Sequence, residues 1–414
     1  MTPTSLTFSI TSPQIHIWLV GVSFVLFQFF LQLSSGVVIG SIMDEMQLSA
    51  LATGILSSAF YYVYTSLQIP VGLLFDIKST RFLLTGAALI CSVGCIFFAQ
   101  SHSLFLLILS RLLIGGGAAF AFIGLSHLLR QHFPLTQFAF MIGLSETLGF
   151  LVTMLGMISL GLLINHWGWR AFINSSALAG LIIAALSWKF IPPNVVPVSD
   201  ISRRKQLLII LTSGKLWVNG VFVGLSFTVI TVFGAMWAIP FIQVKLGCSL
   251  KDASIIDSLL FCGAALSCPL FGYLAGRLSH RRFLMLFSCL TTALLIMVAL
   301  FLPIQSAITM AVLMFFIGLC CGAYMLAYSI SNELAPKNAL STCTGFINTL
   351  AMLSAPLMQP LVGYLLDLSA SQPNHVYQIG DYQLALVIIP AGLVIASGLV
   401  FLLPEKNQSL QEIT

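Results

Sequence analysis

The stretch PVGLLFDIKSTR, residues Pro70 to Arg81, returns in altered form about 200 residues later as PLFGYLAGRLSHRR, residues Pro269 to Arg282. Each copy follows a hydrophobic run and ends in basic residues. In a chain this apolar, a repeated turn of this kind predicts two homologous halves that return to the same side of a membrane at the same point. Duplicated halves are the usual architecture of secondary transporters, which hold their substrate between the halves near the bilayer midplane.

The composition excludes a soluble globular protein. Hydrophobic residues make up 58% of the chain and charged residues 7%, against about 25% charged residues in an ordinary soluble domain. Apolar runs of about 20 residues, each able to span ~30 Å of hydrocarbon, recur along the whole chain. The sequence therefore predicts an all-α membrane protein with twelve transmembrane helices in two pseudo-symmetric six-helix bundles. The twelve segments are 17–41, 51–75, 82–100, 103–127, 137–164, 170–190, 216–243, 253–275, 283–303, 307–331, 342–366 and 383–403.

The predicted halves are residues 1–190 and 216–414, joined by a cytoplasmic linker at 191–215. Three prolines in KFIPPNVVPVSDISRRKQ, Lys189 to Gln206, favour a linker over a helix there. Thirteen basic residues fall on the side of the linker and only three in the opposite loops, so the positive-inside rule places both termini in the cytoplasm. Residues 1–16 contain no Lys or Arg and no cleavage site follows, so no signal peptide is expected.

Several function classes are disfavoured by what the chain lacks. No G-x-x-x-x-G-K-[ST] loop and no large extramembranous segment is present, which disfavours ATP-driven transport. The nine cysteines have no metal-ligand spacing, so we expect no metal and no cofactor. The formal charge of +5 reflects membrane topology, and we assign no nucleic-acid partner to it. A membrane-embedded enzyme would need clustered His, Asp or Glu at one depth, and the histidines are dispersed, so we do not expect an enzyme.

The repeated turn suits a conformational gate. Gly72 and Gly272 would let neighbouring helices approach closely. Asp76 could accept hydrogen bonds from a helix N-terminus or pair with a basic side chain. Such contacts can lock one conformation and break in another. The predicted gate consists of Gly72, Asp76, Arg81, Gly272, Arg277 and Arg281.

These residues carry a family resemblance. The pattern G-x-L-x-D-(x)4-R between the second and third helices resembles the signature loop of the major facilitator superfamily, and the later copy is similar to its second-half version. Ile77 stands where the family usually has a basic residue, Ser79 replaces a glycine, and Gly276 replaces the aspartate of the second copy. The resemblance implies the fold of that superfamily and alternating access, with a second-half lock that cannot use a carboxylate.

A second match concerns the fourth helix. RLLIGGG, Arg111 to Gly117, fits the R-x-x-x-G-x-G pattern that the resembled family associates with proton coupling. An arginine inside a bilayer costs at least ~2.5–3.5 kcal/mol, so it must face the bundle interior and find a partner. Glu146 is the other ionisable residue well inside a first-half helix. We predict that Arg111 and Glu146 interact, directly or through water or substrate, and couple transport to protons. A static ion pair is the alternative. Asp257 and Glu333 are expected near helix ends, at gates or caps.

Cargo contacts are predicted from polar and aromatic residues at intermediate depth. The candidates are Gln28, Gln32, Tyr61, Tyr64, Thr228, Trp237, Tyr324 and Asn348. In the resembled family, helices 1, 4, 7 and 10 line the central cavity, which ranks Gln28, Gln32, Arg111 and Tyr324 first. Each candidate is equally compatible with a packed hydrogen bond between helices.

The direction of transport and the cargo rest on looser patterns. The stretch GFLVTMLGMISLG, Gly149 to Gly161, lacks the prolines of the family's exporters, which favours uptake. YYVYTSLQIPVGLLFD and QPLVGYLLD are similar to the phagosomal amino-acid transporters of intracellular bacteria. We therefore expect a monomeric transporter in the bacterial inner membrane, taking up an amino acid or similar small polar solute with protons. The alternative is proton-linked export of a drug, siderophore or metabolite, which a cavity rich in Phe and Met would favour.

Overall fold

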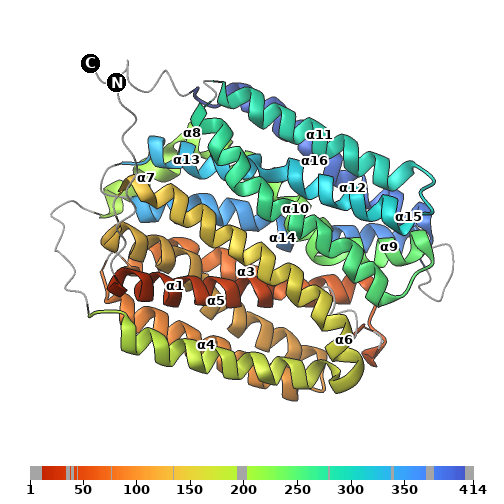
Figure 1. The fold of residues 1–414 in the computed structure, drawn as a ribbon, viewed down its shortest axis with the longest axis horizontal. Coiled ribbons are helices and arrows are strands. Elements are labelled where there is room, and N and C mark those ends of the chain that lie inside the picture. The colour runs from red at the N-terminus through yellow and green to blue at the C-terminus, as the bar shows by residue number, and fades with distance from the viewer. Residues whose placement is uncertain are drawn as a thin grey trace.

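The structure is a computed structural model of the 414-residue chain. It describes residues 12–33, 38, 42–43, 45–75, 77–133, 135–193, 203–277, 280–336, 340–369 and 377–405. Over these ranges every regular element is a helix. Figure 1 shows most of the helices running side by side along the long axis of the molecule, with α1 to α6 gathered below most of α8 to α16.

The first half contains six membrane crossings in five helices. These are α1 (Ser12–Leu33), α3 (Ala50–Phe75), α4 (Thr80–Gln100), α5 (Leu104–His132) and α6 (Leu135–Phe190). The long α6 holds two crossings because its backbone breaks at Gly168, where φ is +75°. A residue without a Cβ adopts this conformation at little cost. The break separates the predicted helices 137–164 and 170–190.

The second half has the same order of crossings with more internal breaks. Its elements are α7 (Arg203–Thr212), α8 (Gly214–Thr228), η1 (Val229–Trp237), α9 (Ala238–Leu246), α10 (Leu250–Arg277), α11 (Arg281–Phe301), α12 (Ala307–Cys320), η2 (Cys321–Ala323), α13 (Tyr324–Leu334), α14 (Leu340–Ser369), α15 (Ile379–Leu386), α16 (Ile388–Leu399) and η3 (Val400–Leu402). One crossing runs through α8, the π-helical turns of η1 and α9. Another runs through α12, η2 and α13.

One expectation about the linker is wrong. The prediction that Lys189–Gln206 is not helical fails at its end, because α7 begins at Arg203. The prolines that argued against a helix all lie between Pro192 and Pro197, and nothing in RRKQLLIILT opposes one.

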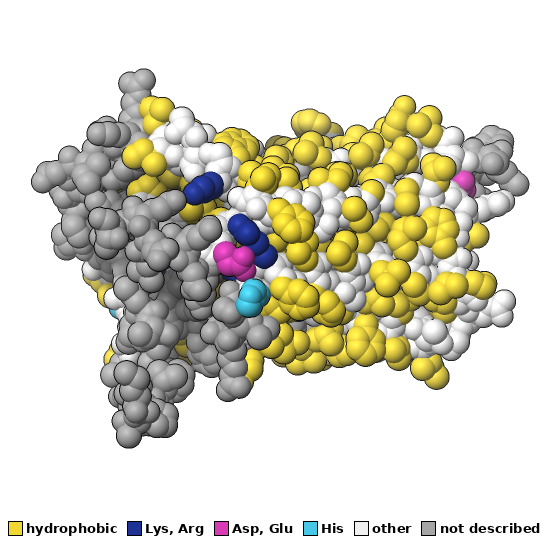
Figure 2. Space-filling view, turned by 90° about the horizontal axis from the view of Figure 1, so that it is seen from above, with side chains coloured by type: hydrophobic (Ala, Val, Ile, Leu, Met, Phe, Trp, Pro, Cys, Tyr) yellow, Lys and Arg dark blue, Asp and Glu magenta, His cyan; other side chains and the backbone are white. Residues whose placement is uncertain are grey.

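The twelve crossings are confirmed. Ten helices are long and apolar enough to cross a membrane, and Met141–Gly156 is a shorter apolar helix. The remaining crossing is α3, which is less apolar because Ser57, Ser58 and Gln68 lie on it; all three side chains are fully buried inside the protein. Figure 2 shows hydrophobic side chains covering the middle of the surface, while most of its visible charged side chains gather at one end. The protein is therefore a multi-pass membrane protein.

Two helix pairs make most of the contacts between the halves, α3 with α14 and α6 with α10. Proline shapes both contacts. Pro360 has no N–H for the carbonyl of Pro356 four residues earlier, and the hydroxyl of Tyr62 donates to that carbonyl instead, at 3.1 Å. Pro269 likewise frees the carbonyl of Ala265, which accepts a hydrogen bond from Thr147 Oγ1 at 3.1 Å. In each pair a hydroxyl of the first half takes the place of the missing N–H.

Candidate functional site

A cavity lies between the two halves at the centre of the helices. Its lining residues come from α1, α3, α5 and α6 on one side and from α8, α13 and α14 on the other. They are Gln28, Phe29, Tyr64, Phe122, Glu146, Phe227, Tyr324, Met325, Tyr328, Asn348 and Met352. Within this cavity the centre of a water molecule can occupy a volume of about 20 Å³. This is room for a water molecule rather than a solute, so the halves must separate before a cargo enters.

Four of the eight predicted cargo contacts line this cavity, namely Gln28, Tyr64, Tyr324 and Asn348. Tyr324 packs its ring against Phe227 at 4.7 Å between centroids, and its hydroxyl lies 3.3 Å from Cys268 Sγ. The aromatic wall of the second half is therefore formed by α8 and α13, and α10 contacts it through Cys268.

The other four predicted contacts lie outside the cavity. Gln32 accepts a hydrogen bond from Gln28 and donates to Met352 Sδ at 3.4 Å, so it stands behind the cavity wall. Tyr61 is fully buried against Phe60. Thr228 donates to the carbonyl of Leu225 in its own helix, and Trp237 is buried at the end of η1. Of these four, Gln32 fits the alternative of a packed hydrogen bond between helices, because Met352 lies on α14.

Glu146 is the one carboxylate among the lining residues. Its side chain is 5% exposed, and within the described ranges it makes no hydrogen bond and no ion pair. A charge buried in this way is costly unless a proton or a cation accompanies it. The cavity therefore contains one site for a single positive charge.

Arg111 does not pair with Glu146. Its Nη1 donates to the carbonyl of Leu31 at 3.1 Å and its Nη2 to the carbonyl of Ser57 at 3.2 Å. The guanidinium carbon also lies 5.2 Å from the ring centroid of Phe60. The predicted direct pairing is wrong for this conformation, while a link through water or substrate stays a prediction.

The glycines of α5 explain the position of the Arg111 side chain. A Cβ on Gly115 would lie 2.2 Å from the carbonyl oxygen of Phe60, so only glycine lets α5 approach α3 this closely. That approach carries Arg111 to the backbone of α3 and away from the cavity. Gly115 therefore brings a neighbouring helix against the arginine.

An amide and tyrosine network forms one wall of the cavity. Tyr328 donates from its hydroxyl to Asn348 Oδ1 at 2.8 Å. Asn348 Nδ2 donates to Gln68 Oε1 at 2.8 Å and to Tyr64 Oη at 3.4 Å. The network joins α13 and α14 of the second half to α3 of the first. Its polar groups are arranged around the space that Glu146 faces.

The gate residues make contacts mainly within their own halves. Arg81 Nε donates to the carbonyl of Ile191 at 2.5 Å, at the end of α6. Arg281 pairs with Glu333 at 2.9 Å and donates to the carbonyl of Pro404 at 2.8 Å. The neighbouring Arg282 Nε donates to the carbonyl of Leu403 at 3.0 Å, in the same relation that Arg81 has to Ile191.

The remaining gate residues are less informative or differ from expectation. Gly72 is buried in α3. Gly272 is exposed, and a Cβ added there would meet nothing within 4 Å, so the predicted close helix approach is wrong for this position. Asp76 and the side chain of Arg277 lie outside the described residues.

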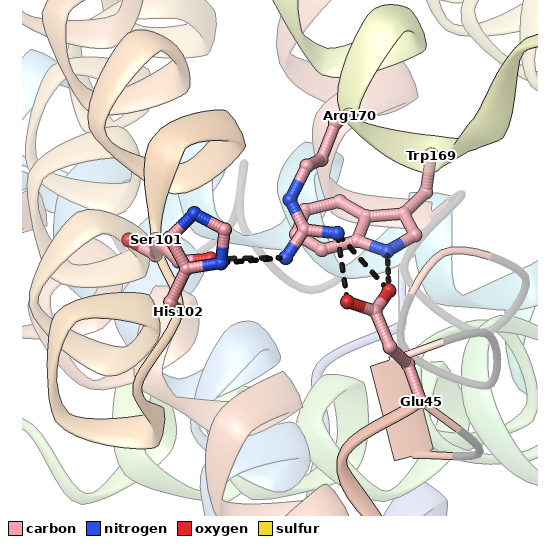
Figure 3. Close-up of polar contacts among 5 residues, drawn as sticks. All are labelled: Glu45, Ser101, His102, Trp169 and Arg170. Carbon is pink, nitrogen blue, oxygen red and sulfur yellow. Dashed lines mark hydrogen bonds and ion pairs between the residues drawn. The ribbon is translucent and has the colours of Figure 1, made fainter.

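A second polar cluster lies at the turn between the end of α4 and the start of α5 (Figure 3). There the chain between α1 and α3 meets α6. Arg170 Nη1 pairs with Glu45 at 2.8 Å, and Arg170 Nη2 donates to the carbonyl of Ser101 at 3.2 Å. Trp169 Nε1 donates to Glu45 at 2.7 Å. These hydrogen bonds, that of Trp169 first, lower the pKa of Glu45. Arg170 therefore connects α6 to the segment that contains Glu45 and to the turn at Ser101.

Sequence reasoning missed much of the cavity wall. The signal for Tyr328 was present, because it lies one turn from Tyr324 on the same helix face. Phe29, Phe122, Phe227, Met325 and Met352 gave no signal, because the chain has 32 phenylalanines and 14 methionines and nothing in the sequence distinguishes those that face the cavity.

Comparison with known proteins agrees with this architecture. The family model described as Major Facilitator Superfamily matches residues 18–358 and 221–412. The multidrug resistance protein MdtG of a Rahnella species is 28% identical over 295 residues, covering 67% of this chain and 69% of its own length. The uncharacterized transporter YybO of Bacillus subtilis is 22% identical over 406 residues, covering 91% and 90%.

Two solved structures share the fold. A bacterial homologue of the human lysosomal transporter Spinster, in an inward-facing and unoccupied conformation, has a TM-score of 0.72 at 16% identity and covers 95% of this chain and 97% of its own. The nucleoside transporter NupG has a TM-score of 0.72 at 12% identity, with 94% and 99% covered. With its twelve crossings and central cavity, the chain belongs to the Major Facilitator Superfamily of membrane transporters.

Proposed function

We propose that this transporter exchanges protons for a small amphipathic solute that carries a positive charge, with Glu146 as the group that binds either one. The observation that carries the proposal is the unpaired carboxylate of Glu146 in a cavity whose lining contains no Arg, Lys or His. One carboxylate can be neutralised by one proton or by one cationic group of a cargo. Competition between the two couples their movements in opposite directions.

The walls of the cavity support a cargo that is both cationic and apolar. Three tyrosines and three phenylalanines line it, together with two methionines. Aromatic faces attract a cation by roughly 0.5–2 kcal/mol each when water is excluded, and methionine adapts its shape to apolar groups. These features correspond to the exporter alternative that the sequence left open. The name of the relative MdtG, a multidrug resistance protein, is in keeping with it.

Binding of tetraphenylphosphonium to the purified protein, measured by calorimetry over a range of pH, tests this proposal. We expect binding to strengthen as pH rises, with release of a proton on binding. Glu146→Gln should weaken binding by about a hundredfold and remove the pH dependence. Glu45→Gln is the matched control, since Glu45 lies outside the cavity. Equal binding by the wild type and Glu146→Gln would contradict the assigned role.

A second candidate is proton-driven uptake of an amino acid. It is supported by the absence of proline between Gly149 and Gly161, where the described backbone of α6 continues without a break. Arg111 is held on backbone carbonyls, so the carboxylate of such a cargo would be bound by the amides of Gln28 and Asn348. Proton-driven accumulation of an amino acid in right-side-out vesicles, abolished by Glu146→Gln, would replace the first candidate with this one.

We also infer that the protein works as a monomer in the inner membrane of a bacterium, with residues 1–190 and 216–414 as its two halves and both termini in the cytoplasm. The excess of basic residues on one side supports this orientation. Reporter fusions at the C-terminus test it: a fluorescent protein should fold there, and alkaline phosphatase should be inactive. Active phosphatase would reverse the orientation.

A further inference from the structure

We propose that Asp257 is a second proton-binding site, placed along the α6–α10 contact so that protons pass between it and Glu146. This inference rests on the proposed proton coupling and adds a residue from the second half. We expected Asp257 at a gate or as a helix cap. Instead its side chain is 0% exposed, and neither carboxylate oxygen has a hydrogen-bond partner in the described part of the chain.

Two contacts fix the register of α6 against α10. Thr147 Oγ1 donates to the carbonyl of Ala265 at 3.1 Å, and the ring centroids of Phe150 and Phe261 lie 6.4 Å apart. The two helices therefore run antiparallel, with Glu146 beside the level of Ala265. Asp257 precedes Ala265 by eight residues on α10, which is about 12 Å along the helix axis. The Phe150–Phe261 contact lies between these two levels.

Asp257 lies on the inner face of α10. It is eleven residues, or about three turns, from Cys268. Cys268 contacts the hydroxyl of the cavity residue Tyr324, so this face of the helix looks toward the cavity. A Cβ on Gly234 of η1 would lie 3.1 Å from Leu260 Cδ2, which places the π-helical turns against the same part of α10. π-Helical turns within helices are frequent at functional sites.

Unpaired polar groups occur on both of these elements. The indole N–H of Trp237, the last residue of η1, also lacks a partner among the described residues. An unsatisfied donor and an unsatisfied acid therefore occur in two helices that pack together. Buried polar groups without partners are rare, and a functional role is one explanation for them.

The charged groups on the helices packed against α10 do not neutralise Asp257. Lys245 of α9 donates to the carbonyl of Leu300 at 3.0 Å, and Glu333 of α13 pairs with Arg281 of α11. Glu146 of α6 lies about 12 Å away along the helix axis. The described part of η1 and α12 carries no charged residue. A proton is thus the positive charge that this carboxylate can take.

The transfer moves a proton alone. The carboxylic acid of Asp257 gives a proton to a water molecule, and the water gives a proton to the carboxylate of Glu146, so no electron is moved and no other bond changes. The Phe150–Phe261 contact excludes water between the two levels while the rings stay together. Separation of α6 from α10 during the transport cycle would open this route, which makes proton passage depend on the conformation of the halves.

Infrared spectroscopy of the protein in lipid, recorded over a pH titration, tests the proposal without any cargo. The wild-type spectrum minus that of Asp257→Asn should show the carbonyl-stretch band of a protonated carboxyl group, and this band should disappear as pH rises. Asp252→Asn, at an exposed position on the same helix, is the matched control for the loss of a carboxylate from α10. A band that is absent at every pH, or that never disappears, would overturn the proposal.

Proteoliposomes that contain a pH-sensitive dye give the second readout. In Asp257→Asn, proton movement coupled to tetraphenylphosphonium should fall by about tenfold or more, while binding of the cation stays within about twofold of the wild type. Undiminished proton movement would overturn the relay. The two proposals fail separately: a Glu146→Gln protein that behaves as wild type removes the proposed function, while the band of Asp257 is measured independently.

Discussion

Arg111 Nη1 donates a 3.1 Å hydrogen bond to the carbonyl oxygen of Leu31, which fastens the buried guanidinium to the backbone of α1. Its second bond, to Ser57, reaches α3. One side chain on α5 therefore joins three helices of the first half. Arg111 therefore acts in this conformation as a structural link between helices, and the carboxylate of Glu146 is the charged group that faces the cavity.

Replacing Arg111 should therefore cost stability more than binding. A lysine has a single ammonium and cannot reach both carbonyls in the way that the planar guanidinium does. Each lost bond to a charged donor is worth about 1.5–3 kcal/mol. We expect Arg111→Lys to lower the Tm of the detergent-purified protein clearly and to leave tetraphenylphosphonium binding by the surviving folded protein within about threefold. A normal Tm with lost binding would show that Arg111 belongs to the site.

Tyr328 should contribute through its hydroxyl. Tyr328→Phe removes the 2.8 Å bond to Asn348 and leaves the ring that faces the cavity in place. The expected loss is about 0.5–1.5 kcal/mol of stability. Tyr364→Phe is the control, since Tyr364 is half exposed on the lipid-facing side of α14. Thermal unfolding of both variants in the same detergent is the measurement, and equal Tm values would show that the Tyr328 bond adds nothing.

The bond between Thr147 and the carbonyl of Ala265 should matter only because Pro269 is present. Thr147→Val keeps the shape of the side chain and leaves that carbonyl unpaired, at a cost of about 0.6–2 kcal/mol in a membrane protein. In a protein that already carries Pro269→Ala, the new N–H can bond to Ala265 within α10. A double-mutant cycle on Tm should therefore show a coupling between the two substitutions. Strict additivity would contradict this reading of the proline.

The Glu45 cluster predicts a pH dependence of stability. Hydrogen bonds from Trp169 and Arg170 lower the pKa of Glu45 in the folded protein. The stabilisation is present above the unfolded pKa of about 4.3 and is lost as pH falls through the lower folded pKa. Wild type should melt above Glu45→Gln near neutral pH, by a small margin because the pair is partly exposed. The two Tm values should converge in acid, and a difference that grows in acid would contradict the assignment.

Much of the fold could be predicted from the sequence, because membrane helices are set by the length and apolarity of each segment. The twelve segments and the two bundles followed from those properties, and the turn motif identified the family. The positions of Gln28, Tyr64, Tyr324 and Asn348 at the cavity also followed, because polar residues at mid-depth are costly unless they face a cavity or a partner.

Lateral packing was the part that could not be predicted. Whether Arg111 meets Glu146 depends on how closely α5 approaches α3, and Gly115 decides that through a contact no single sequence reveals. The burial of Asp257 was missed for a similar reason, since its depth along α10 gives no information on which helices surround it. The aromatic cavity wall was hidden by the 32 phenylalanines of the chain.

The paired arrangement of Arg81 with Ile191 and Arg282 with Leu403 bears on the energy barrier of the transport cycle. In each case an arginine at the start of the third crossing of a bundle holds the end of the sixth crossing of that same bundle. These bonds hold the third and sixth crossings of each bundle together. A tilt of one bundle against the other leaves them intact. The barrier to alternation is then set by the hydrogen bonds between the halves, such as those of Tyr62, Thr147 and Asn348. We therefore expect the halves to move against one another while the helices within each bundle stay packed.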